Sequence, residues 1–435
     1  MLEFALSFFL FSFFYLQTNT NNKLTNKLKT MTNTTQIKKT SLQLAAAFLV
    51  AAAISVPATA AQTLSITIPD ASTEKGALII RNNHGKEILS FTPSAYAQVQ
   101  YINASADGSG KNRNGFALRR TSITLAAKID QHWDGRVSFE FDSKTSGGIA
   151  DTGYIECAYV GYTNDFGSLK VGILKPHFLQ EEITAAIALP AIERSIATNY
   201  LSSPSAEGPR GLSAAHIGIY WDGNFAIDSI AKIRYGTSLT NAVGQDYDAR
   251  SNDLQITVYA ESKFDFGKSG KLTTGLSGVA NYGDDGALPG TRAGTASALT
   301  NAGTVFGIEP YLRYSNGRLN ILLDSYYVNG DDASKISDTF AAIGIVSYRT
   351  EFNLEPVFRV ARLAAKTKNA GVHSGYQSYV PASDEHSNAV TYYLGVNYYA
   401  NKHVKLSAGY EYGRYFGTGD SDSSSAFRTQ AQVAF

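Results

Sequence analysis

Five basic residues are the candidates for binding a solute: Arg120, Arg136, Lys175, Arg194 and Arg210. A guanidinium group can donate two parallel hydrogen bonds to one oxyanion, whereas a lysine ammonium group acts as a point charge. Acids lie close to the last three in the sequence: Glu181, Glu182, Glu193 and Glu207. The basic residues could therefore face an anion, or they could form salt bridges that brace the chain, and the sequence leaves both alternatives open.

The acids and two of the basic candidates, Arg194 and Arg210, belong to the stretch 176–212, which shows no strand pattern. A structureless segment of this length is usually functional. It contains apolar residues such as Ile183, Leu189 and Ile196, which need a surface to pack against. The inner wall of a wide β-barrel would offer one, and a segment folded there would narrow the channel. We therefore expect Glu181, Glu182 and Glu193 to lie on a constriction loop.

The end of the chain shows which elements would position this segment. Phe427, Ala431, Val433 and Phe435 share one parity, while Arg428, Gln430 and Gln432 share the other. A period of two with one apolar and one polar side is typical of a strand between lipid and water. After Ala61 no apolar run reaches 18 residues, so membrane-spanning helices are excluded.

Sixteen segments carry this alternation. They are 94–104, 116–130, 134–143, 153–163, 167–175, 213–221, 224–236, 252–264, 270–282, 304–316, 318–329, 339–350, 352–363, 389–400, 403–415 and 426–435. Tight turns alternate with long polar connections, and Asp222-Gly223 is one of the tight turns. Short turns on one side and long loops on the other are typical of outer-membrane barrels.

An open sheet edge is not tolerated in hydrocarbon, so these strands should close on themselves. The predicted fold is all-β: a 16-stranded antiparallel transmembrane β-barrel with the third extracellular loop folded into the pore. Aromatic residues near the tight turns, such as Trp133 and Trp221, indicate a belt at the bilayer boundary. The competing interpretation is the core of a soluble β-sandwich.

The chain divides into three predicted parts. Residues 1–60 combine an upstream extension with a signal peptide that starts at Met31 and is cleaved before Ala61, after the small residues Ala58 and Ala60. Residues 61–93 form a short periplasmic segment, for which a small hairpin is one alternative. Residues 94–435 form the barrel. Whether residues 1–30 are translated is a question that the sequence leaves open.

The charge balance disfavours nucleic acid as a partner. Removing residues 1–60 leaves 33 basic and 36 acidic residues, without the basic footprint of a nucleic-acid binder. By parity, ten basic and eight acidic residues would face inward, which is a mixed lining. The basic ones are Arg120, Lys128, Arg136, Lys232, Arg234, Lys263, Arg313, Arg359, Lys405 and Arg428. The acidic ones are Glu140, Asp142, Asp228, Glu261, Glu309, Asp324, Glu355 and Glu411.

Other chemistry is sparse. No nucleophile elbow, phosphate-binding glycine loop or metal-ligand spacing stands out, and we expect no cofactor and no catalytic residue. Four residues of one external loop could bind a metal or could be solvated loop residues: His373, Asp384, Glu385 and His386. The run 417–422 resembles part of a calcium loop but lacks the closing Glu.

Three stretches resemble one known family. They are GFALRRTSITLAAKI, YIECAYVGY, and VGILKPHFLQEEIT followed by IERSIA. They are similar to the phosphate-selective porin O and P family of Gram-negative outer membranes. The resemblance covers about residues 95–435 and is most specific at Lys175-Pro176, Glu181-Glu182 and Glu193-Arg194-Ser195. It implies a sixteen-stranded trimeric barrel whose third extracellular loop folds into the pore.

The predicted function is that of an outer-membrane porin for passive diffusion of small hydrophilic solutes, with an anion or phosphate preference as one option. Its expected partners are small inorganic or organic solutes, outer-membrane lipid and two further copies of the chain in a homotrimer. The alternatives are an outer-membrane barrel with an enzymatic role or one with an adhesive role. The charged residues at the narrowest point would decide the selectivity.

Overall fold

The computed structural model describes the ranges 65–67, 78–81, 87–107, 113–141, 153–202, 212–241, 254–283, 303–330, 338–365, 386–417 and 421–435, all within the compact unit Leu64–Phe435. In these ranges, no helix has both the length and the apolar character needed to cross a membrane. Predictions that concern residues 1–64 lie outside the described residues, and the predicted domain boundaries remain predictions.

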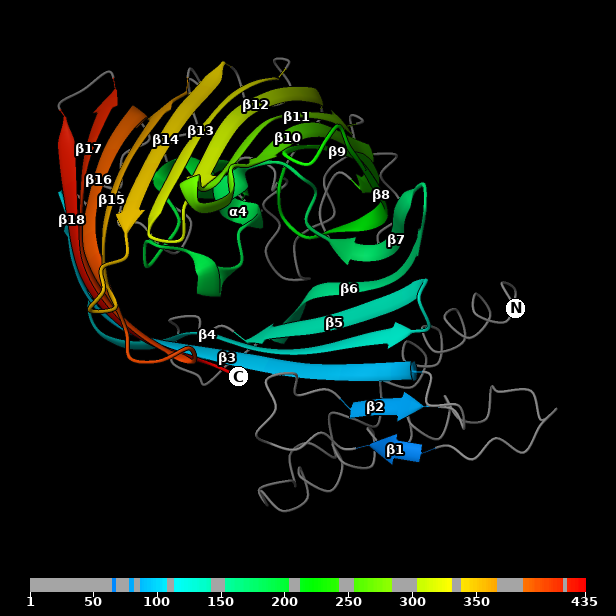
Figure 1. Ribbon diagram of the computed structural model, residues 1–435. Coiled ribbons are helices and arrows are strands. Elements are labelled where there is room, and N and C mark those ends of the chain that lie inside the picture. The colour runs from blue at the N-terminus through cyan, green and yellow to red at the C-terminus, as the bar shows by residue number, and fades with distance from the viewer. Residues whose placement is uncertain are drawn as a thin grey trace, which may run out of the picture. The chain divides into compact units, whose positions relative to one another are not determined.

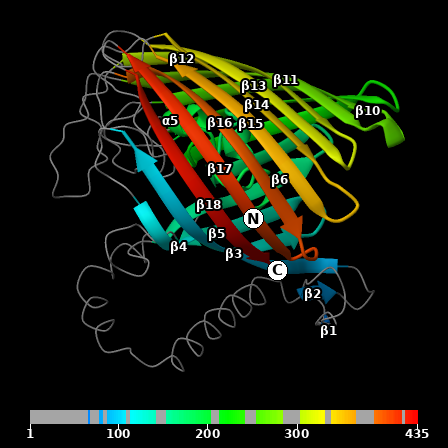
Figure 2. The ribbon, with the colours of Figure 1, turned by 90° about the vertical axis from the view of Figure 1, so that its left-hand side faces the viewer.

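Sixteen antiparallel strands form a closed barrel, in which each strand pairs with the next and β18 pairs back with β3 (Figure 1). Phe427 of β18, for example, lies opposite Asn103 of β3. The strands are β3 (Glu87–Ala106), β4 (Arg113–Ile129), β5 (Trp133–Phe141), β6 (Gly153–Asn164), β7 (Gly167–Leu174), β8 (His216–Ala226), β9 (Ala231–Asn241), β10 (Leu254–Asp265), β11 (Lys271–Gly283), β12 (Gly303–Ser315), β13 (Leu319–Gly330), β14 (Thr339–Tyr348), β15 (Leu354–Ala364), β16 (His386–Tyr399), β17 (Val404–Gly417) and β18 (Asp422–Ala434). Figure 2 shows β16, β17 and β18 lying side by side and tilted.

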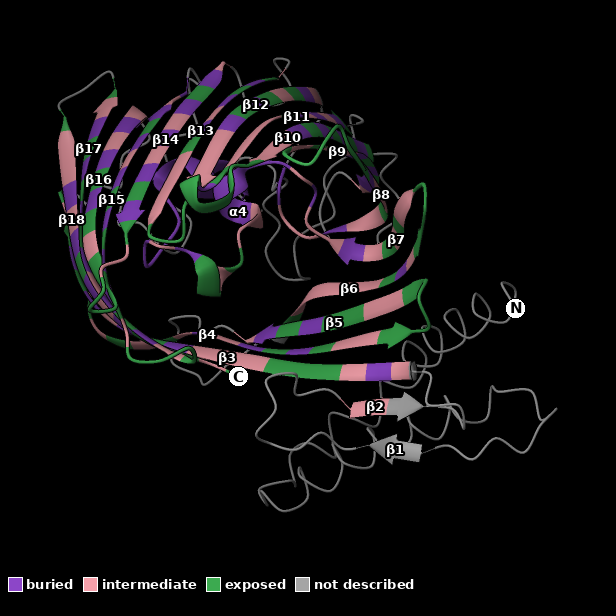
Figure 3. Cartoon of the chain, in the orientation of Figure 1, coloured by how far each residue is buried: buried purple, intermediate pink, exposed green. Residues whose placement is uncertain are grey.

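Burial alternates along the strands, as the banding in Figure 3 shows. On β10, Gln255 and Thr257 are buried while Ile256 and Val258 are exposed. Polar side chains therefore point inward and apolar side chains point outward, which is the arrangement that lipid outside and water inside require. The closed 16-stranded antiparallel barrel that the sequence predicted is confirmed.

One predicted turn is wrong. The structure continues β8 through Asp222 and Gly223 to Ala226, and the chain reverses at 227–230 instead. The side chain of Asp228 accepts hydrogen bonds from the backbone N–H groups of Ile230 and Ala231, each at 2.7 Å. An Asp that binds the backbone two and three residues on stabilises a turn, so Asp228 is a turn residue and not an inward-facing strand acid.

Two short strands precede the barrel: β1 (Ser65–Thr67) and β2 (Leu78–Arg81). They pair antiparallel with each other, and β2 also pairs with the first residues of β3 (Leu78 opposite Phe91). The small-hairpin alternative for residues 61–93 therefore agrees with the pairing of β2 and β3.

The connection between β7 and β8 contains three short helical elements: α4 (Gln180–Ile183), η1 (Ala186–Ala188) and α5 (Ile196–Ser202). We call residues 175–202 the β7–β8 segment. Its buried apolar side chains, including Phe178, Ile196 and Leu201, join one hydrophobic cluster with strand residues such as Val328 and Ile343. Of the apolar residues that set this stretch apart in the sequence, Ile196 belongs to this cluster, whose strand residues come from β11–β17.

Candidate functional site

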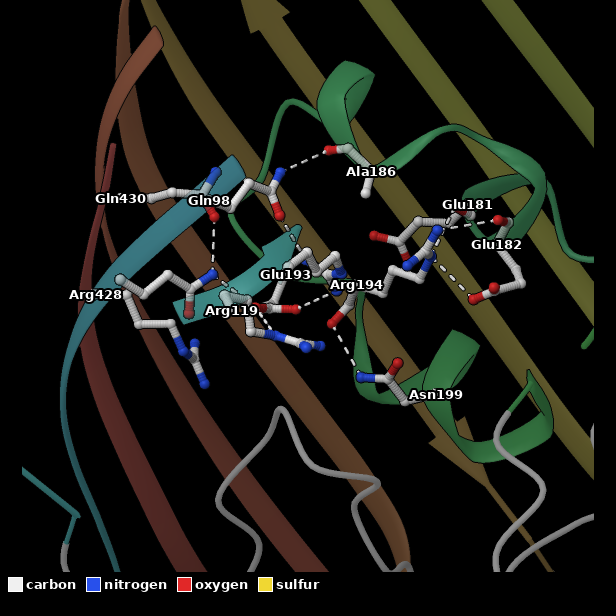
Figure 4. A network of polar contacts seen from close by, with 12 residues as sticks. Gln98, Arg119, Glu181, Glu182, Ala186, Glu193, Arg194, Asn199, Arg428 and Gln430 are labelled. Carbon is white, nitrogen blue, oxygen red and sulfur yellow. Dashed lines mark hydrogen bonds and ion pairs between the residues drawn. The ribbon is translucent and has the colours of Figure 1, made fainter. Parts of the chain in front are cut away.

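Glu193 of the β7–β8 segment pairs with two arginines of the barrel wall (Figure 4). Its Oε1 lies 2.8 Å from Nε of Arg119, and its Oε2 lies 3.0 Å from Nη2 of Arg120. The side-chain amide of Gln100 donates a further hydrogen bond of 2.8 Å to Oε1. Two guanidinium groups and an amide therefore hold one carboxylate, which fixes this part of the segment to β3 and β4.

A β-bulge explains how two consecutive arginines reach the same carboxylate. Gln98 of β3 pairs with Arg120, but the next residue, Val99, pairs with Leu118, so the strand register skips Arg119. Consecutive strand residues normally point to opposite faces, and a bulge re-aims the extra residue. The alternation along the strand placed Arg120 correctly on the inner face. It could not predict that Arg119 also points inward.

Arg359 connects the segment to a second part of the wall, at β15. Its Nη1 lies 2.9 Å from Oε1 of Glu181 and 2.5 Å from the backbone oxygen of Glu193. Its Nη2 lies 2.9 Å from Glu411, whose other oxygen lies 2.9 Å from Arg428. The side chains of Arg359 and Glu181 are each 1% exposed, so this is a buried charge ladder in which opposite charges alternate.

Glu181 also holds the start of α5. Its Oε2 accepts hydrogen bonds from the backbone N–H of Ser195 (2.9 Å), from the Ser195 hydroxyl (2.6 Å) and from the Thr198 hydroxyl (2.6 Å). One carboxylate therefore joins α4, α5 and the wall.

Glu182 forms the third ion-pair group. Its two oxygens lie 2.7 Å from Nζ of Lys175 and 2.9 Å from Nε of Arg194. Arg194 Nη2 also donates to the backbone oxygens of Glu182 and Thr184, both at 3.1 Å. These hydrogen bonds connect two parts of the segment with each other. Lys175 reaches back to Glu156 on β6 at 3.6 Å.

These partners decide the charge state of the segment's acids. Burial on its own would raise the pKa of Glu193, but Arg119 and Arg120 outweigh it and hold the pKa well below the usual value of 4.5. Burial likewise opposes the charge on Glu182, and Arg194 with Lys175 keeps its pKa below 4.5. Both acids are therefore charged and neutralised by basic neighbours.

The start of α4 is held differently, by two acids of the wall. The backbone N–H groups of Leu179 and Gln180 donate to Glu309 of β12 at 2.9 and 2.6 Å. The N–H of Gln180 also lies 3.2 Å from Oδ2 of Asp324 on β13. Leu179 has φ of 62°, a conformation that costs energy in a residue other than glycine, so these contacts hold a strained backbone.

A pocket of about 370 Å³ lies between the segment and strands β11–β16. The segment contributes Thr184, Leu189 and Pro190 to its lining, and the wall contributes Arg313 and Glu355. Ser347, Asn397 and Tyr399 already bind the carboxylate of Glu355. Ser315 and Asn320, which flank the short turn between β12 and β13, also line the pocket. The pocket therefore lies on the side of the segment that is near the short turns.

The predicted site residues fall into three groups. Arg120, Lys175 and Arg194 all contact acids of the segment, as do the predicted constriction residues Glu181, Glu182 and Glu193 with their basic partners. Arg136 lies on β5, opposite Tyr159 of β6. Arg210 lies outside the described residues. Sequence reasoning placed Arg359 and Arg428 on the inner face but did not connect them to the segment.

Strands β4–β10 also carry inward charges that do not contact the segment. Among the described strand residues from Lys128 to Asp265, six are basic and four are acidic once Glu140, which lies 3.8 Å from Arg120, and Glu156, which pairs with Lys175, are set aside. The basic residues are Lys128, Arg136, Lys170, Lys232, Arg234 and Lys263. The acidic residues are Asp134, Asp222, Glu261 and Asp265. We call this set the β4–β10 basic stripe.

The described residues contain no group of three or more possible metal ligands. Of the four loop residues that could have bound a metal, only His386 is described: it is the first residue of β16, and its Nε2 lies 3.1 Å from Asp422. In the run 417–422, Gly417 ends β17 and Asp422 begins β18, and the residues between them are not all described.

The comparisons with known proteins agree with this architecture. An anion-selective porin from Comamonas acidovorans has a TM-score of 0.55 at 12% identity, with 80% of this chain and 100% of that chain covered. OmpF of Salmonella typhi in complex with daunomycin has a TM-score of 0.54 at 12% identity, with 79% and 98% covered. The outer membrane channel DcaP of Acinetobacter baumannii has a TM-score of 0.53 at 11% identity, with 80% and 97% covered. At these identities the likeness shows the fold. No curated protein matches the sequence.

A closed 16-stranded barrel with a polar inner face and an apolar outer face is the architecture of bacterial outer-membrane porins, which are passive channels. The family model of the phosphate-selective porins O and P matches residues 95–275 of this chain. The resemblance found in the sequence is therefore confirmed over residues 95–275.

Proposed function

We propose that the β7–β8 segment is the third extracellular loop of this porin and that it forms the constriction of the pore. Three observations support this role. Apolar side chains of the segment pack against residues of β11–β17, and its acids pair with inward-facing arginines. In addition, a carboxylate of the wall accepts hydrogen bonds from the backbone of the segment. Solutes would then pass between the segment and the part of the wall that it does not contact.

We further propose that the channel prefers small hydrophilic anions. The observation that carries this proposal is the β4–β10 basic stripe, with six basic residues against four acids. The acids of the segment do not offset this excess, because Arg359, Arg194 and the pair Arg119 and Arg120 neutralise them. Phosphate is one anion that such a lining could admit, since lysine and arginine both bind its oxygens.

The test is the reversal potential of the purified protein in planar lipid bilayers under a gradient of potassium chloride. We expect an anion preference, and a smaller one in Arg136→Gln and Lys170→Gln. Lys268→Gln is the matched control, because it removes a basic residue of the short turn after β10. A cation preference in the unmodified protein would overturn the proposed selectivity. Repeating the measurement with phosphate as the only anion would show whether phosphate is preferred to chloride.

We propose no catalytic role and a homotrimeric assembly, the latter from the family resemblance. An enzymatic barrel would show lipase or protease activity in the purified protein, and an adhesive barrel would block conductance while its loops bound a partner. Chemical cross-linking in outer membranes, followed by electrophoresis without heating, tests the trimer: a ladder that ends at two copies or extends beyond three contradicts it.

A further inference from the structure

Two wall acids meet under the start of α4. Glu309 and Asp324 are 0% and 3% exposed, and both carboxyl groups lie within hydrogen-bonding distance of the backbone N–H of Gln180, at 2.6 and 3.2 Å. They therefore lie side by side. The second oxygen of Glu309 binds the N–H of Leu179, whereas Oδ1 of Asp324 has no hydrogen-bond partner among the described residues.

The charged and titratable groups around this pair are bound elsewhere. Arg313 of β12 donates to the backbone oxygen of Gln180 and to the hydroxyl of Thr184. The carboxylate of Glu181 pairs with Arg359. The other neighbouring groups also have their own partners: Tyr311 binds Glu261, Tyr326 binds the backbone oxygen of Ala197, and His177 stacks on Tyr259.

The flanking strands bring no charge to the pair. Ser277 of β11 lies opposite Glu309, and Ile343 of β14 lies opposite Asp324. Within the part of the chain that the structure describes, no basic group forms an ion pair with either acid. Two adjacent buried carboxylates without a counter-ion repel each other strongly, and one shared proton removes that repulsion.

We propose that Glu309 and Asp324 form a proton-binding site that couples pH to the docking of α4. With one proton bound, Asp324 is neutral and donates to Glu309, while both oxygens of Glu309 accept the N–H groups of Leu179 and Gln180. When the proton leaves to water, two negative charges face each other and the strained turn at Leu179 is released from the wall. This inference rests on the proposed role of the segment as the pore loop, because the release would then be visible as channel closure or noise.

The site makes a quantitative prediction about alkaline pH. Release of α4 is linked to the loss of one proton, so the released fraction should rise about tenfold per pH unit until release dominates. The rate of closing events in planar bilayers should follow the same slope, because the segment moves in the pore only when this end is free.

Two variants of the pair should behave in opposite ways. In Asp324→Asn the side-chain amide replaces the protonated carboxyl as a neutral donor, so α4 stays docked and the slope with pH is lost. In Glu309→Gln an NH₂ group replaces one of the two accepting oxygens and faces a backbone donor, so closing events are frequent at every pH. Asp265→Asn is the control, since Asp265 is an exposed inward acid that pairs with Lys271; it should keep the slope of the unmodified protein.

Infrared spectroscopy supplies a second readout that does not depend on conduction. The unmodified barrel should show the absorption of a protonated carboxyl group that disappears with alkaline titration, and Asp324→Asn should lack it. Electrophoretic mobility before and after heating confirms that each variant is folded. A pH slope that persists in Asp324→Asn overturns the proposal, and so does an infrared signal that this substitution leaves unchanged. A channel that prefers cations but shows both signals would overturn the anion preference and leave the proton site standing.

Discussion

At Glu193 the β7–β8 segment presents an acid to two wall arginines, whereas at Leu179 and Gln180 it presents backbone N–H groups to two wall acids. We call these the arginine anchor and the carboxyl anchor. The arginine anchor joins opposite charges and needs Glu193 to be ionised. The carboxyl anchor places like charges together and, as proposed above, needs one of its acids to be protonated.

The comparison shows how one segment can be held against a wall by two interactions of opposite pH dependence. The arginine anchor weakens when protons are added, and the carboxyl anchor weakens when they are removed. We therefore expect the whole segment to be docked at pH values between those at which either anchor weakens. Each anchor can be disrupted separately.

The largest effect is expected from Arg359→Gln. Arg359 binds the carboxylate of Glu181 and the backbone oxygen of Glu193, so it helps to hold the arginine anchor in place. Its removal leaves the buried carboxylates of Glu181 and Glu411 each with one basic partner fewer. Removing one partner of a buried ion pair costs about 3–5 kcal/mol. The segment should undock, which raises the noise of the single-channel current at neutral pH.

Arg318→Gln is the control for this substitution, because it removes an arginine from an exposed pair with Glu351 on a short turn. Exposed pairs contribute about 0–1 kcal/mol, so the conductance should stay unchanged. If Arg359→Gln conducts like the control, Arg359 does not hold the segment.

A smaller effect is expected from Glu193→Gln. This substitution keeps the shape of the side chain in the arginine anchor and removes its negative charge. Arg119 and Arg120 then lose their shared carboxylate, so the lining gains positive charge. We expect a higher anion preference in the reversal potential and a modest rise in noise. Glu351→Gln, an exposed acid of a short turn, should change neither. An unchanged reversal potential would mean that Glu193 does not face the permeation path.

The smallest effect is expected from moderate acidification of the unmodified protein. The pKa values of Glu182 and Glu193 are lowered in the folded state, so these acids stabilise the docked segment fully above the usual value of 4.5. That contribution is lost only as the pH falls through their lower folded pKa values. Conductance and noise should therefore stay constant from neutral pH to about 4.5 and change below it. A transition already complete at pH 5 would contradict the lowered pKa values.

The arginine anchor shows how far the sequence could predict the site. Parity placed Arg120, Arg359, Glu411 and Arg428 on the inner face, and the apolar residues of 176–212 indicated that this stretch packs on a wall. The sequence could not show that Arg119 also points inward, because a bulge becomes visible only in the pairing of β3 with β4. It could not show the carboxyl anchor either, since this anchor uses the backbone of Leu179 and Gln180 rather than a recognisable side-chain motif.

Local chemistry determined the strands, their number and the closure of the barrel, because alternating polarity and tight turns act over a few residues and a sheet in lipid cannot keep an open edge. The exception at Asp222 and Gly223 was decided by the side chain of Asp228, which stabilises a turn a few residues later. The pairing of charges was decided by the tertiary structure alone. Glu181 and Arg359 are 178 residues apart in sequence, and only the closed barrel brings them together.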